Sequence, residues 1–258
     1  MKILRAVAAL AWLLALPAGA ADEPKLPLPF ETYRGQPPER VVGSSRVVEA
    51  RSRFVLGPVL QGDEVHHSFQ IPNPGPEPME LRDVSVCSGC IPAGHSQRIA
   101  PGGVGQISIL ITTDWLGGRG IDGAITATTT SPALPQLEIQ VVLEVKEFAA
   151  LDPYRVWLRG TAGAAEPITA TCLVVPNEDY PFSITGIETR RGVWFEHSLR
   201  EVERDGRRAY EITLVNTRTK PGPYQDVLFV QTDHPERPEF RIRVEGRLEP
   251  SSENRAGR

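Results

Sequence analysis

The residue types and spacing best suited to chemistry lie in one short segment, Cys87-Ser88-Gly89-Cys90. Two thiols at this spacing can form a disulfide, act as a redox pair or share a metal ion. A redox pair of the thioredoxin kind needs its first cysteine at the N-terminus of a helix, where the helix dipole lowers the thiol pKa. Pro92 and Gly94 follow closely and oppose a helix, so the sequence argues against the redox interpretation.

A metal site is a second interpretation of the same segment. The thiolates of Cys87 and Cys90, with imidazole from His95 and from His66 or His67, would suit copper(I) or zinc. His67 shares the apolar face of a predicted strand, so it fits a core histidine as well. The interpretation that we favour is a structural turn closing a strand over residues 81–86, with the cysteines joined in a disulfide or left as thiols. No cofactor is then expected.

A glycine-rich loop offers a candidate binding contact. Residues 118–123 read GRGIDG and formally match the dinucleotide-binding pattern G-x-G-x-x-G. That pattern needs a helix after its last glycine, whereas the next residues, AITATTT, favour a strand, so we interpret the match as chance in a hairpin loop. Trp115 and Arg119 lie in the same loop and could contact a partner. The tryptophan could equally fold back over the end of a domain.

Other catalytic patterns are missing from the sequence. The five histidines include no H-E-x-x-H pair, and no G-x-S-x-G segment occurs. Charges of both signs alternate over residues 188–208, which is typical of a solvated strand face with cross-strand ion pairs. We therefore expect a protein that is not an enzyme. Cys172 stands alone in a predicted strand over residues 168–175 and is expected to be buried, with pairing to the first domain or to a second chain as the alternative.

The first 20 residues have the layout of a secretory signal peptide. Lys2 and Arg5 precede an apolar run over residues 6–16, Pro17 interrupts it, and small residues follow at 18–20. The run is too short for a spanning helix, and no later segment is apolar enough to cross a membrane. We expect cleavage after Ala20 or the next residue and a periplasmic or secreted product. Loss of the leader leaves 26 basic and 32 acidic residues, a net charge of −6, so nucleic acid is not an expected partner.

Most of the mature chain has the pattern of β-strands. Apolar and polar residues alternate over residues 64–71, 107–111 and 137–145, as in strands with one buried face. Asp205-Gly206 is a hairpin turn signal between two strand-like segments. Residues 22–48 hold several prolines and no sustained period, so we expect an extended linker there.

The second half of the chain repeats the first. Residues 130–141 read TSPALPQLEIQV, and residues 233–244 read DHPERPEFRIRV, at an offset of 103. Pro72-Asn73 and Pro176-Asn177 correspond at an offset of 104, and further pairs agree with these offsets. A repeated unit of about 100 residues, made of short strands between turn residues, predicts tandem β-sandwiches.

The first repeat also resembles a known family. The residues that carry the resemblance are Phe54, Gly57, Gly62-Asp63, Phe69, Asn73, Gly75, Pro101-Gly102 and Ile107. They resemble a common secreted bacterial immunoglobulin-like domain of unknown function, akin to Hydin-type (ASH) and MSP-like modules. The resemblance covers residues 50–147 and extends in outline to 148–249. It implies a fold and an exported location but no activity. The family has a Cys-Gly-Cys turn, whereas this chain has one residue more between its cysteines.

These observations predict an all-β protein with two tandem immunoglobulin-like β-sandwiches. We expect a signal peptide at 1–20, a Pro-rich linker at 21–48, the sandwiches at 49–147 and 148–249, and a disordered tail at 250–258. The expected function is non-catalytic binding or assembly in the bacterial envelope, with unidentified envelope proteins as partners. The alternative is a metal-binding or thiol-redox accessory protein that uses Cys87 and Cys90.

Overall fold

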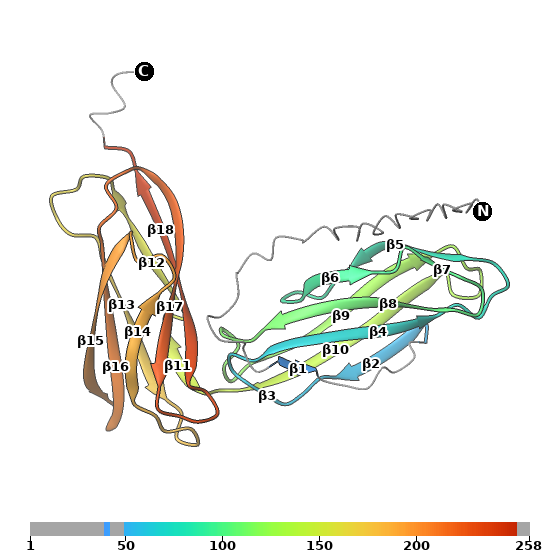
Figure 1. Ribbon diagram of the computed structural model, residues 1–258, viewed down its shortest axis with the longest axis horizontal. Helices are drawn as coiled ribbons and strands as arrows, with labels where there is room; N and C mark the ends of the chain where they lie inside the picture. The colour runs from blue at the N-terminus through green and yellow to red at the C-terminus, as the bar shows by residue number, and fades with distance from the viewer. Residues whose placement is uncertain (1–38, 42–48, 252–258) are drawn as a thin grey trace, which may run out of the picture. The chain divides into compact units, whose positions relative to one another are not determined.

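The computed structural model describes residues 39–41 and 49–251, and none of these residues is helical. The first half contains ten strands: β1 (Glu39–Val41), β2 (Arg51–Val55), β3 (Val59–Leu60), β4 (Glu64–Pro72), β5 (Met79–Ser85), β6 (Ile91–His95), β7 (Arg98–Ile99), β8 (Val104–Thr112), β9 (Gly120–Thr129) and β10 (Gln136–Lys146). The second half contains eight: β11 (Ala149–Asp152), β12 (Arg155–Thr161), β13 (Thr169–Pro176), β14 (Ile184–Thr189), β15 (Phe195–Arg204), β16 (Arg207–Asn216), β17 (Gly222–Thr232) and β18 (Glu239–Glu249). The chain is therefore all-β, as predicted (Figure 1).

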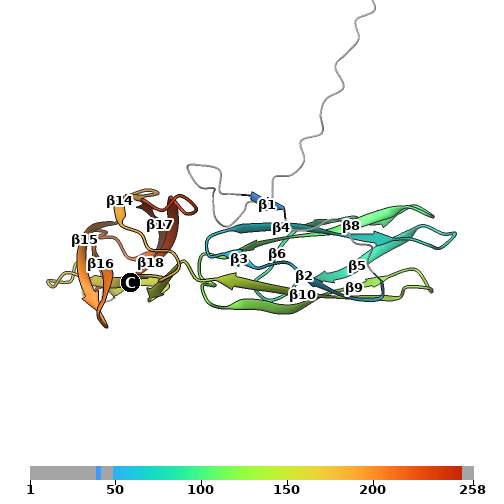
Figure 2. The same ribbon diagram turned by 90° about the horizontal axis from the view of Figure 1, so that it is seen from below.

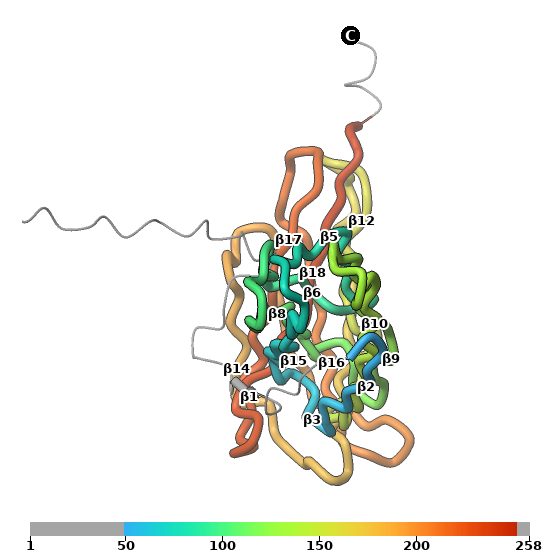
Figure 3. The backbone as a smooth tube through the Cα atoms, turned by 90° about the vertical axis from the view of Figure 1, so that its right-hand side faces the viewer, coloured from blue at the N-terminus to red at the C-terminus, as the bar shows by residue number. Residues whose placement is uncertain are grey.

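The first sandwich is built from two sheets. One has the strand order β1-β4-β8-β6, and the other has the order β2-β10-β9-β5-β7, with β3 also paired to β10. The two sheets form separate layers (Figures 2 and 3). The predicted alternation is confirmed on β10, where every second side chain is buried and belongs to the core between the sheets: Leu137, Ile139, Val141, Leu143 and Val145. Burial of this apolar stripe is the main force that holds the layers together.

The second sandwich repeats this arrangement with eight strands. Its sheets have the orders β11-β13-β16-β15 and β12-β18-β17-β14. The buried side chains of β18 follow the same alternation as those of β10, with Phe240, Ile242 and Val244 in place of Leu137, Ile139 and Val141. The tandem immunoglobulin-like sandwiches predicted from the repeat are thus present, and both belong to one compact unit, Gln36–Arg258.

The loop before the last strand shows that the repeats share detail as well as topology. In the first sandwich Thr129 Oγ1 donates to the Leu134 carbonyl oxygen at 2.5 Å and accepts from the Ser131 amide. In the second sandwich Thr232 Oγ1 donates to the Arg237 carbonyl oxygen at 2.5 Å and accepts from the His234 amide. The offset of 103 therefore superposes two loops of the same hydrogen-bonding pattern, and Arg237 occupies the position of Leu134.

The hairpin predicted at Asp205-Gly206 is confirmed. It connects β15 to β16, and both turn residues have positive φ, 53° and 74°. A two-residue turn of this kind matches the twist of the flanking strands, which is why Asp-Gly is preferred there. The expected ion pairs across these strands are also present. The N···O distance is 2.7 Å between Arg200 and Glu211 and 3.0 Å between Arg208 and Glu201.

Two sequence expectations need correction, and others lie outside the described residues. The linker predicted at 21–48 includes a short strand, β1, which pairs in parallel with β4 and so becomes part of the first sandwich. The glycine-rich match at 118–123 is not all loop, because β9 begins at Gly120. The signal peptide at 1–20, the rest of the linker and most of the tail fall in segments that are not described. The described residues contain no helix that could cross a membrane.

Candidate functional site

The cysteine turn is closed by a disulfide between Cys87 and Cys90. The turn follows β5, and the Cys90 amide donates to the Cys87 carbonyl oxygen at 2.9 Å. Gly89 has a φ of +85°, a conformation that side-chain-bearing residues rarely adopt. Cys87 is 4% exposed and belongs to the core of the first sandwich, and Cys90 packs against that core. In this state neither sulfur is a thiolate that could bind a metal ion or attack a substrate.

The histidines predicted as further metal ligands lie apart from one another. His67 points into the core, where its ring meets Phe69 at 4.5 Å and Phe54 at 6.1 Å between centroids. His66 lies on the opposite face of β4, 4.0 Å from Glu64. His95 is exposed at the end of the edge strand β6. In the described part of the chain, no three His, Cys, Asp or Glu side chains gather in a group that could hold a metal ion.

Trp115 folds back over the first sandwich instead of projecting from its loop. The indole is half-buried and packs against the core beside Cys90. A Cβ placed on Gly89 would lie 3.7 Å from the Trp115 ring, which shows how closely the ring approaches the cysteine turn. Arg119 is exposed, and its backbone carbonyl accepts from the Val145 amide at 2.9 Å. Of the two predicted contact residues of this loop, Arg119 is exposed and Trp115 is half-buried.

Cys172 is a buried thiol, as expected. It lies on β13, is fully shielded from solvent, and its Sγ–H donates to the Pro153 carbonyl oxygen at 3.3 Å. Burial, together with the smaller effect of the nearby Asp152 carboxylate, raises the pKa of Cys172 to about 12. The thiol is therefore an inert core residue at neutral pH.

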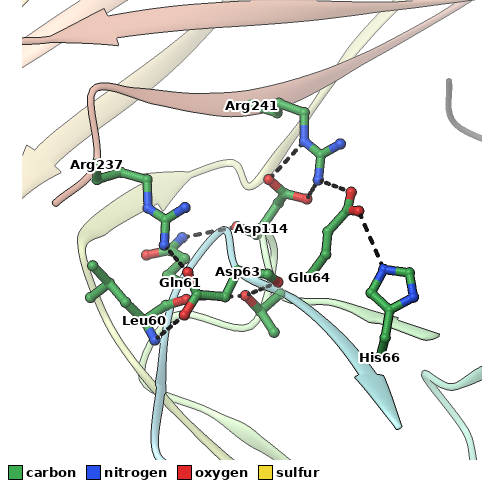
Figure 4. A network of polar contacts seen from close by, with 9 residues as sticks. Leu60, Gln61, Asp63, Glu64, His66, Asp114, Arg237 and Arg241 are labelled. Carbon is green, nitrogen blue, oxygen red and sulfur yellow. Dashed lines mark hydrogen bonds and ion pairs between the residues drawn. The ribbon is translucent and has the colours of Figure 1, made fainter. Parts of the chain in front are cut away.

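The strongest cluster of polar side chains was not predicted from the sequence. It lies where the turn between β3 and β4 of the first sandwich meets the loop between β17 and β18 of the second (Figure 4). We call this cluster the junction and define it by Gln61, Asp63, Glu64, Asp114, Arg237 and Arg241. Asp63 and Arg237 form a salt bridge at its centre, and each side chain is 2% exposed. Asp63 also accepts from the Leu60 amide at 3.1 Å.

Gly62 explains how the arginine reaches its partner. Its φ of +91° turns the backbone sharply between β3 and β4, a conformation in which glycine has no steric penalty. The Arg237 guanidinium lies directly over it, because a Cβ on Gly62 would stand 3.3 Å from Arg237 Cζ. A side chain at this position would both strain the turn and displace the arginine. The Gly-Asp turn thus gives the guanidinium a close approach to Asp63.

Arg241 forms the second ionic contact of the junction. Its Nη2 lies 2.7 Å from Asp114 and 3.1 Å from Glu64, and its Nε donates to Asp114 at 3.0 Å. Arg241 lies on β18, and the two carboxylates come from the first sandwich. The pairing with Asp114 is bidentate, which gives an arginine contact both strength and a fixed orientation. His66 extends the network through Glu64 (Figure 4).

Gln61 and Leu60 lie beside the segment in which the chain passes from the first sandwich to the second. The Gln61 Oε1 accepts from the amides of Phe148 and Ala149 at 3.0 and 3.1 Å, and its Nε2 donates to the Asp114 carbonyl at 2.9 Å. Leu60 belongs to the core of the second sandwich although it comes from the first. Phe148 lies in this connecting segment, and its ring stacks on that of Phe182 with 4.7 Å between the ring centroids. The first sandwich therefore contributes an acidic, amide-bearing end, and the second supplies arginines and aromatic rings.

A signal for the junction exists in the repeat. Aligned at an offset of 103, Arg237 replaces Leu134 in a loop that is otherwise alike, and an arginine that replaces a buried leucine needs an anionic partner. The Gly62-Asp63 turn is the corresponding sequence signal in the first sandwich. What the sequence does not give is the pairing of the two, which are 174 residues apart.

Comparisons with known proteins add little to this picture. No family model and no curated protein matches the sequence. Among solved structures, the chain is similar to the extracellular cadherin domains 1–4 of protocadherin gamma B7, with 13% identity and a TM-score of 0.29, over 66% of this chain and 41% of that one. It is also similar to the secreted serine protease VesC from Vibrio cholerae, with 9% identity and a TM-score of 0.28, over 71% and 49%. The chain thus spans less than half the length of either. The resemblance to Hydin-type modules stays a prediction.

Proposed function

We propose that the chain is an exported, non-catalytic immunoglobulin-like protein that binds a partner in the bacterial envelope. The observation that carries this proposal is the junction. Buried and half-buried ionic contacts between the sandwiches use Asp63, Arg237 and Arg241 to hold one module against the other. The hydrogen-bonding groups of these side chains are occupied within the protein, so we expect the partner to bind at other loops and strand edges of the paired sandwiches.

The predicted leader and the Cys87–Cys90 disulfide support the exported location. Disulfides persist in oxidising compartments such as the periplasm and are rare in the cytosol. Tandem sandwiches also leave strand edges and loops for a partner, and both routes are common in recognition.

The experiment is to express the full chain with its leader and to recover it from the periplasmic fraction. Intact mass should show loss of the first 20 or 21 residues, one disulfide and one free thiol. Chemical cross-linking in the intact envelope should give discrete adducts, and a Cys87→Ser/Cys90→Ser variant should give the same adducts. Retention in the cytosol, or loss of the adducts in that variant, would contradict the proposal. A native mass that carries copper or zinc, with two thiols alkylated only after denaturation, would establish the metal-binding alternative instead.

A further inference from the structure

The first sandwich contacts the second through one of its two ends. The second sandwich has an equivalent end of its own. Asp114 is the second residue after β8, and the second residue after the equivalent strand β16 is Arg218. The Gln61 amide donates to the carbonyl of Lys146 on the last strand of its sandwich at 2.9 Å, and the Ala162 amide donates to Glu249 in the same way at 2.9 Å. The equivalent end of the second sandwich therefore has Arg218 in place of Asp114 and Ala162 in place of Gln61.

We call this counterpart the basic end and define it by Arg191, Val193, Trp194, Arg218 and Lys220. It consists of the loop between β14 and β15 and the loop between β16 and β17. The two loops are joined, because the Trp194 carbonyl accepts from the Thr217 amide at 2.8 Å and from the Arg218 amide at 3.3 Å. Backbone hydrogen bonds thus hold the two loops of the basic end together as one surface.

Aromatic rings support the arginines of the basic end. The guanidinium carbons of Arg191 and Arg218 lie 5.0 and 5.9 Å from the centre of the Trp194 ring. Tyr224 packs against Trp194 at 5.2 Å, and its hydroxyl donates to Asn216 at 2.7 Å. The Tyr224 ring lies over Gly246, where a Cβ would stand only 1.9 Å from it. Burial raises the pKa of Tyr224 to about 12, so the ring stays neutral beside the arginines.

The basic end carries an excess of positive charge. Among the residues that the structure describes, none of Arg191, Arg218 and Lys220 forms an ion pair with a carboxylate. Arg218 instead donates to the carbonyls of Lys220 at 2.9 Å and Pro221 at 3.4 Å. The nearby Asp226 uses its two oxygens on the amides of Arg191 and Gly192, at 3.1 and 3.2 Å.

Several exposed arginines elsewhere in the second sandwich have carboxylate partners on a neighbouring strand, as Arg200 and Arg208 do. Arg159 is an exception and lies over the Trp157 ring. The whole chain carries a formal net charge of −4, so a cluster of three cations outside any salt bridge of the described residues is a local exception. A cluster of this sign attracts anionic groups by charge complementarity.

We propose that the basic end binds an acidic peptide segment of a partner protein. The Arg191 guanidinium over the Trp194 ring keeps its N–H groups available, which suits contact with a carboxylate. Arg218 adds its positive charge while its guanidinium holds its own loop. Val193, which is 64% exposed, adds one apolar contact at the centre. A lipid surface fits less well, because Trp194 is half-buried under two guanidinium groups and cannot insert. The inference rests on the proposed function and names the chemistry of its partner.

The test is a titration of the full chain with a synthetic peptide of ten residues that alternates Glu and Ser, followed by its Gln-for-Glu counterpart. Binding is measured by Trp fluorescence and by calorimetry at low and moderate salt. We expect the Glu peptide to bind more tightly and its affinity to fall with salt. The variant Arg191→Gln/Lys220→Gln should weaken binding on the order of tenfold, since it removes two exposed charge pairs. Arg218 is left in place because it holds its own loop.

The matched control is Arg200→Gln/Arg207→Gln, which removes two arginines that already have carboxylate partners. Its affinity for the Glu peptide should stay near that of the wild type. Equal binding of the Glu and Gln peptides, or equal loss in the control, would overturn the inference. So would binding to phosphatidylglycerol vesicles without binding to the Glu peptide. Envelope adducts that survive in Arg191→Gln/Lys220→Gln would refute the inference and leave the proposed function standing, whereas absence of adducts in the wild type would refute the proposed function.

Discussion

The Asp63–Arg237 salt bridge gives the most quantitative prediction. The perturbation is Arg237→Met, which keeps the apolar stem of the side chain and removes its charge. Asp63, which is 2% exposed, would lose its guanidinium partner and keep the hydrogen bond from the Leu60 amide. Removing one partner of a buried pair typically costs about 3–5 kcal/mol, because the other charge stays buried without compensation.

This value needs no discount for solvent screening, since both side chains lie away from water. The assay is urea unfolding of the full chain, followed by Trp fluorescence and circular dichroism. The free energy of unfolding should fall by about 3–5 kcal/mol in Arg237→Met. In the double variant Asp63→Asn/Arg237→Met the losses should be less than additive, with a coupling of at least about 1 kcal/mol.

The matched control is Arg247→Ala. Arg247 pairs with Glu249 at 3.1 Å, but the two side chains are 69% and 58% exposed. Its loss should change stability by less than about 1 kcal/mol, as is usual for surface ion pairs. If Arg237→Met lost no more than this control, the junction would not contribute the stability that its burial implies, and the reasoning would be wrong.

Three further predictions address the junction and the cysteines. Asp114→Asn should destabilise the protein by about 1–2 kcal/mol, measured by urea unfolding, because it weakens the bidentate contact with Arg241; added salt should shrink the loss, and a salt-independent loss would contradict an ionic origin. Cys87→Ser/Cys90→Ser should fold with the same circular dichroism and cost about 1–2 kcal/mol, since a short loop gains little from closure; an unfolded variant would refute the structural role. Cys172 should resist iodoacetamide at pH 8 until the protein is denatured. Its pKa is raised in the folded state, so stability should be intact below pH 9 and fall by up to about 4 kcal/mol as pH rises through 12, a loss that Cys172→Ala should remove.

Much of the fold could be predicted because it depends on short-range patterns. The alternation on β10 and β18 sets which side chains enter the cores, and Asp205-Gly206 sets a two-residue hairpin through its backbone preferences. The repeat then extends one topology to both halves. The strand β1 was missed because three residues are too few for a period to be visible.

The sites were harder to predict because they depend on contacts between distant residues. The spacing of Cys87 and Cys90 allows a disulfide, a redox pair or a metal site, and the sequence does not distinguish them, whereas the structure has the disulfide. Trp115 could project or fold back, and only the packed core shows that it folds back. The junction needed the pairing of Asp63 with Arg237, which no local pattern reveals.

The two sandwiches are proposed to use the same end differently: the first contacts its neighbour there, and the second binds an acidic partner. The most direct measurement is photo-cross-linking from an unnatural residue at Val193 in the intact envelope, with mass spectrometry of the adduct. We expect an adduct to an acidic segment of one protein that disappears in Arg191→Gln/Lys220→Gln. An unchanged adduct in that variant, or cross-linking to lipid alone, would contradict it.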